Sequence, residues 1–64
     1  MIRDFADHVL QELNDVRESK MQGLASGQLT YEKYQYHCGE IHGLDLAMDH
    51  IKAVLKKVED ANNE

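Results

Sequence analysis

Histidine, cysteine and acidic residues gather near the middle of the chain, where they are candidates for metal binding or nucleophilic catalysis. His37 and Cys38 are adjacent, and His42, Asp45 and Asp49 follow at three- and four-residue steps that place them on one face of a helix. A zinc site needs three or four convergent ligands, and the chain contains neither a His-Glu-x-x-His motif nor paired cysteines. We therefore predict no metal site and no cofactor.

The same residues do not make a convincing catalytic set. A nucleophilic cysteine needs a positioned base and a concave pocket, and a short helical chain seldom offers either. We predict that the protein is not an enzyme. His37 is interpreted as a hydrogen-bonded core histidine, and the alternative is a group buried between subunits whose protonation weakens assembly.

The elements that carry these residues are two amphipathic helices. Apolar residues recur at steps of three and four in both halves of the chain, which predicts helix one at about residues 2–26 and helix two at about residues 30–60. The predicted seam of helix one is Ile2, Ala6, Val9, Leu13 and Val16, and that of helix two is Tyr34, His37, Ile41, Leu44, Met48, Ile51, Leu55 and Val58.

The connection between the helices is short. Gly27 can take the left-handed conformation that ends a helix, and Thr30 can cap the amides of the next one. A turn of only residues 27–29 forces the helices to lie antiparallel, so that Ile2 faces Leu55 and Val16 faces Ile41. The predicted fold is all-α: one domain, residues 1–64, forming an antiparallel two-helix hairpin.

Composition narrows the range of partners. The net charge of −5 and the dispersed basic residues, clustered only at Lys52, Lys56 and Lys57, disfavour nucleic acid. No segment has the length and apolarity of a membrane span or a secretory signal. Cys38 is the only cysteine, which excludes a disulfide within the chain and fits a reducing compartment.

A second row of residues beside the seam of helix two predicts a partner. Gly39, Gly43 and Ala47 form a strip of small side chains, flanked by Tyr36 and Val54. Each glycine inside a helix costs about 1 kcal/mol relative to alanine, and such a strip lets another helix come close. The alternatives are a local bend of the helix or a ligand against the bare backbone. The predicted interface also includes Leu10, Leu46 and Leu55.

A hairpin of 64 residues buries little apolar surface alone. We therefore expect a homo-oligomer, with two hairpins dimerising into a four-helix bundle. The first functional hypothesis is a structural or assembly protein that binds its own copies or a virion component. The second is a small inhibitor or adaptor that binds a host protein, and the third is a nucleic-acid or metal-binding module.

The middle third of the chain carries a family resemblance. Residues 27–44, with Tyr31 and Tyr34 followed by Gly39-Glu40-Ile41-His42-Gly43-Leu44, and then Ala47, resemble a segment of small, otherwise helical proteins of tailed bacteriophages. The resemblance implies a bacteriophage protein located in the virion or the host cytoplasm. Members are often encoded among virion-assembly genes, and the resemblance supplies no functional residues.

Overall fold

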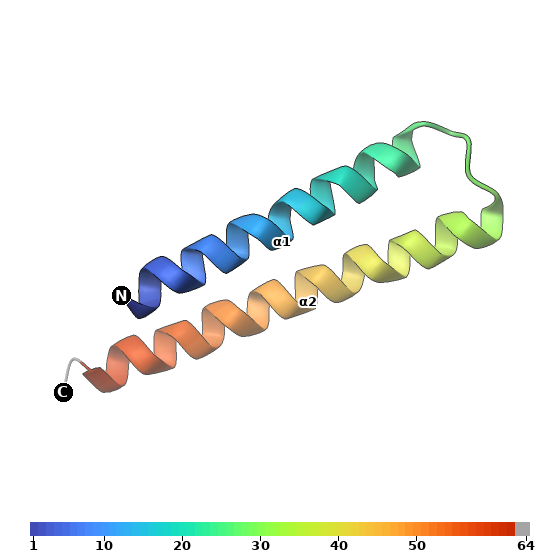
Figure 1. Cartoon of the computed structure of the whole chain (residues 1–64). Coiled ribbons are helices and arrows are strands. Elements are labelled where there is room, and N and C mark those ends of the chain that lie inside the picture. Colours follow the sequence, from blue (N-terminus) through green and yellow to red (C-terminus); the bar gives the residue numbers. More distant parts are fainter. Residues whose placement is uncertain (63–64) are drawn as a thin grey trace.

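The computed structural model of the protein describes residues 1–62, which form two helices joined by one loop (Figure 1). Helix α1 spans Ile2–Ala25 and helix α2 spans Tyr31–Asn62, and no strand occurs in this part of the chain. The helices run antiparallel and bring the beginning of α1 close to the end of α2. The predicted helical hairpin is therefore confirmed, and the molecule is elongated, measuring 52 × 16 × 10 Å.

The loop occupies residues 26–30, which is longer than the predicted turn because one residue on each side serves as a helix cap. The Ser26 hydroxyl donates a hydrogen bond to the Gly23 carbonyl at 2.7 Å and thereby satisfies one of the free carbonyls of α1. Gly27 has the predicted positive φ, at 72°. Thr30 caps α2 as predicted, since its Oγ1 accepts a hydrogen bond from the Lys33 amide at 3.3 Å. At the other end, α2 continues past the predicted residue 60.

Three ion pairs connect the helices along their length. Arg3 pairs with Glu59 at 3.0 Å, Arg17 with Asp45 at 2.7 Å, and Lys20 with Glu40 at 3.0 Å. These pairs are offset by about one helical turn from the predicted pairs, in which Val16 faces Ile41. Helical side chains lean toward the N-terminus of their own helix, which is away from the loop in α1 and toward the loop in α2, so each α1 residue meets an α2 residue that lies further from the loop.

The core is thin. Among the described residues, only Ala6 and Leu55 are buried apolar residues, with exposed fractions of 7% and 8%. Four predicted seam residues are instead exposed, namely Ile2, Val16, Tyr34 and Val58. Arg17 is half-buried where Val16 was expected, because its guanidinium reaches across to Asp45. The remaining contact between the helices comes from half-buried side chains, which are Val9, Leu10, Leu13, Leu24, Ile41, Leu44, Met48 and Ile51.

Candidate interaction surface

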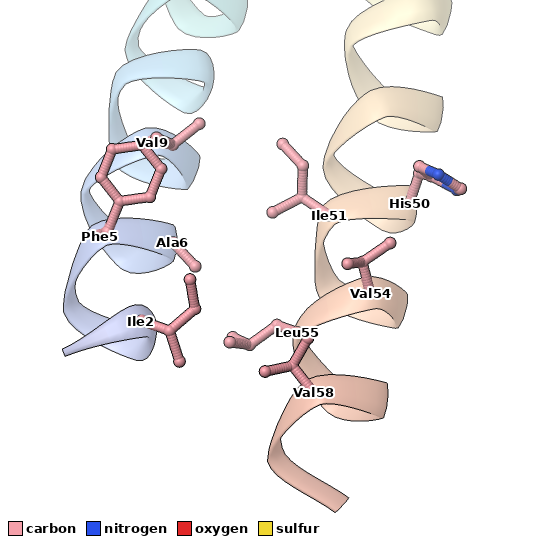
Figure 2. A pocket seen from close by; sticks show the side chains of 9 residues that line it. All are labelled: Ile2, Phe5, Ala6, Val9, His50, Ile51, Val54, Leu55 and Val58. Carbon is pink, nitrogen blue, oxygen red and sulfur yellow. The ribbon is translucent and has the colours of Figure 1, made fainter. Parts of the chain in front are cut away.

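An apolar groove opens between the helices at the end of the hairpin that carries both termini. Figure 2 shows side chains of α1 facing side chains of α2 across it. The hollow has a volume of about 260 Å³. Its lining consists of eight apolar residues and one histidine, namely Ile2, Phe5, Ala6, Val9, His50, Ile51, Val54, Leu55 and Val58. An open, apolar hollow of this kind is typical of a surface that receives a side chain of a partner.

The groove belongs to a longer apolar face of the hairpin. On each helix, apolar or small residues follow the groove toward the loop at steps of four or seven residues. This spacing places them on the same side of the molecule as the groove. We call this side the apolar face and define it as Ile2, Phe5, Val9 and Val16 of α1 with Tyr36, Gly43, Ala47, Val54 and Val58 of α2.

The other edge of the helix pair is polar. Arg3, Leu10 and Arg17 each follow an apolar-face residue by one position, which places them about 100° further around α1, across the seam. Two of them form the ion pairs with Glu59 and Asp45. A second hollow on this side is lined by polar residues together with Leu10 and Met48. The hairpin therefore has one charged side and one side that is mainly apolar.

The central row of predicted interface residues lies in the open. Tyr36 is 68% exposed and Val54 is 44% exposed, and Gly39, Gly43 and Ala47 are all exposed. Apart from its chain neighbours and the adjacent backbone of α2 itself, a Cβ added at either glycine would meet no atom within 4 Å. The glycines are therefore not required by packing between α1 and α2, and the space above them is free for another molecule.

The three remaining predicted residues are placed differently from this row. Leu55 is buried between the helices and forms the floor of the groove (Figure 2). Leu10 is half-buried on the polar side. Leu46 is exposed and lies two positions from both Leu44 and Met48, which face α1, so it points away from the hairpin. Leu10 and Leu46 therefore lie outside the surface that holds the central row, whereas Leu55 shares the groove with Val54.

Phe5 and Val58 border the groove but are absent from the predicted interface. Phe5 is 67% exposed. The available signal was its position beside the seam of helix one, three residues after Ile2 and four before Val9. What the periodicity could not reveal is that this flank of helix one lies on the same side as the glycine row of helix two.

Ionisable side chains form one cluster near the loop end. Glu40 Oε2 lies 3.0 Å from Lys20 Nζ, and Glu40 Oε1 lies 2.7 Å from His37 Nδ1. The hydrogen bond from Lys20 lowers the pKa of Glu40 below its ordinary value, desolvation opposes the shift, and His37 adds to it. His37 is half-buried and hydrogen-bonded, as predicted. Its ring also meets that of Tyr36 edge to face.

Residues 1–62 offer no candidate metal site. No three His, Cys, Asp or Glu side chains in this range come together in a way that could hold a metal ion. Cys38 is a half-buried free thiol. Neither described helix combines the length and the apolarity that crossing a membrane requires.

The fold and the surface together define a class of structure, a two-helix hairpin with an unpartnered apolar face. Comparison with known proteins does not extend this description. No protein-family model matches the chain, and neither does any curated protein or any solved structure.

Proposed function

We propose that the protein is a non-enzymatic interaction module that associates with its own copies through the apolar face. The observation that carries the proposal is the imbalance between the core and the surface. Among residues 1–62, only two apolar residues are buried. On the apolar face alone, the exposed apolar residues include Ile2, Phe5, Val16, Tyr36 and Val54. Burial of such a side chain contributes about 1.5–3 kcal/mol, so a partner would supply stability that the isolated hairpin lacks.

The amount of exposed surface supports a partner of similar size. A compact monomer of 7.4 kDa exposes about 4,200 Å². The hairpin exposes 5171 Å². The excess, on the order of 1,000 Å², is similar to the roughly 800 Å² that each partner contributes to a standard protein interface. Two hairpins packed face to face form a four-helix bundle, which is the assembly we propose.

The setting that we propose follows from the resemblance to small proteins of tailed bacteriophages. A self-associating hairpin fits a structural or assembly component of the virion. The alternative is an inhibitor or adaptor in the host cytoplasm whose apolar face receives a helix of a host protein. Mass spectrometry of purified virions distinguishes a virion component from a protein that acts only during infection.

Self-association is tested by sedimentation velocity over a range of concentrations. We expect a dimer that dissociates on dilution, and we expect Val54→Glu to weaken it strongly, because the variant places a charge on the apolar face. His42→Glu is the matched control, since His42 is an exposed residue on the same helix outside the apolar face. A well-folded monomer at every concentration would overturn self-association and favour the host-protein alternative.

A further inference from the structure

We propose that the second copy lies antiparallel across the apolar face, with its loop over the terminal end of the first, so that Tyr36 of each copy fills the groove of the other. The inference rests on the proposed self-association and specifies its geometry. Three observations support it: the order of residues along α2, the charges at the two ends of that row, and the match between the groove and the tyrosine.

The order of residues along α2 is nearly symmetric about its middle. Tyr36 and Val54 lie equally far from the level of Asp45, and so do Gly43 and Ala47. A two-fold axis that runs between the two copies at this level, perpendicular to α2, makes an isologous contact, in which each residue of a pair meets the other residue of the partner copy. It brings Tyr36 to Val54, at the edge of the groove, and it brings Gly43 to Ala47 at the centre.

The charges at the ends of the row complement each other in this orientation. Glu32 precedes Tyr36 by four positions and Lys57 follows Val54 by three, so both lie in line with the row. Both side chains are exposed, and within residues 1–62 neither forms an ion pair with the other helix. Antiparallel copies place Glu32 beside Lys57 twice. Copies with both loops at the same end keep the two residues at opposite ends of the bundle.

The groove fits the side chain that would enter it. Tyr36 is exposed on the apolar face near the loop, and the hollow of about 260 Å³ lies on the same face near the termini. A tyrosine buries a flat apolar ring and keeps its hydroxyl in contact with water, which suits a hollow that is apolar inside and open at its mouth. Gly43 has no side chain to hold the partner helix away, so the ring can reach the floor.

The orientation is tested with a single spin label on each copy. The label is placed at Gln28, in the loop, by Gln28→Cys in a chain whose native thiol is removed by Cys38→Ser. Pulsed electron paramagnetic resonance then measures the distance between the two spin labels of the dimer. Antiparallel copies give a separation close to the 52 Å length of the hairpin, whereas loops at the same end give one close to its 16 Å width. A label at His42 is the control, because it is central in both orientations.

The occupant of the groove is tested by substitution of Tyr36. Tyr36→Ala is expected to raise the dissociation constant of the dimer at least tenfold, the effect of losing an aromatic anchor, whereas Tyr36→Phe keeps the ring and stays within about threefold of the parent. Glu32→Lys is expected to weaken the dimer about threefold at low salt, and adding Lys57→Glu to restore it. Circular dichroism verifies that each variant remains helical.

The outcomes separate the inference from the proposed function. A dimer with a short distance between the loop labels overturns the antiparallel arrangement and leaves self-association standing. A long distance with no effect of Tyr36→Ala overturns the tyrosine as the occupant of the groove. A helical monomer at all concentrations overturns the proposed function and this inference together. A long distance combined with a weakened Tyr36→Ala dimer supports the inference.

Discussion

At the scale of single residues, the ionisable side chains of this hairpin hold the two helices together rather than converge on a site. Lys20, Glu40 and His37 form a chain of short contacts beside the loop end of the apolar face. The Lys20 ammonium group contacts the Glu40 carboxylate across the helix pair. A partly exposed pair of this kind contributes modestly to stability, and here it also connects the two helices.

Glu40 should make stability depend on pH in acid. Because contact with Lys20 lowers its folded-state pKa, the ionised carboxylate stabilises the hairpin at any pH above the ordinary glutamate value. That contribution is lost as the pH falls from about 4.3 through the lowered folded-state pKa. Thermal unfolding at a series of pH values is the measurement. Glu40→Gln should be less stable than the parent near neutral pH, and the difference should shrink in acid. A difference that is constant with pH would show that the carboxylate charge is not responsible.

At the scale of elements, α2 carries glycines that its own helix and its neighbour do not need. A methyl group at Gly43 would meet no atom within 4 Å apart from its chain neighbours and the adjacent backbone of α2. Glycine in a helix interior nevertheless lowers helix stability. By contrast Gly27, with its positive φ of 72°, is required where it stands, because other residues rarely adopt that conformation. The glycine in the loop is explained by the hairpin, whereas the glycine in the helix would be accounted for by the second copy that we propose.

Gly43→Ala should therefore have opposite effects on the helix and on the assembly. Higher helix propensity should stabilise the dissociated hairpin by about 1 kcal/mol. The added methyl group should weaken self-association, because it separates two helix backbones that approach each other at this position. Circular dichroism at low concentration measures the first effect and sedimentation equilibrium the second. Association as strong as that of the parent would mean that no backbone comes close to Gly43.

At the scale of the whole molecule, two long helices share one narrow contact. The hairpin is 52 Å long, and both of its dimensions across that axis are 16 Å or less. Such a shape leaves most side chains exposed to water. A fold of this size is marginally stable without a disulfide, a bound metal ion or a partner. An elongated hairpin with one apolar face gains most by packing that face against another helical pair.

Thermal stability should accordingly rise with protein concentration. For a folded dimer that unfolds to two chains, a tenfold increase in concentration adds about 1.4 kcal/mol per dimer, which corresponds to a rise in Tm of about 5 °C for a fold of this size. Circular dichroism melts over two decades of concentration measure it. A Tm that does not depend on concentration would indicate that the monomer is the folded unit.

The sequence alone was sufficient to predict both helices, the loop and the antiparallel order, because each depends on local chemistry. Three- and four-residue periodicity marks an amphipathic helix, Gly27 permits the left-handed turn, and Thr30 caps the following helix. These signals act over a few residues and need no knowledge of the neighbouring helix. The glycine row was likewise visible as a feature of one helix.

Only the tertiary structure decided which stripe of each helix faces the other and which remains open. Both helices carry apolar stripes wider than one contact, so a small rotation exchanges Val16 for Arg17 in the seam without breaking the periodicity. The observed rotation brings together residues distant in sequence, such as Arg17 and Asp45. That rotation brings Phe5 of α1 onto the same side as Val54 of α2, and the groove exists because two stripes from different helices border one side of the hairpin.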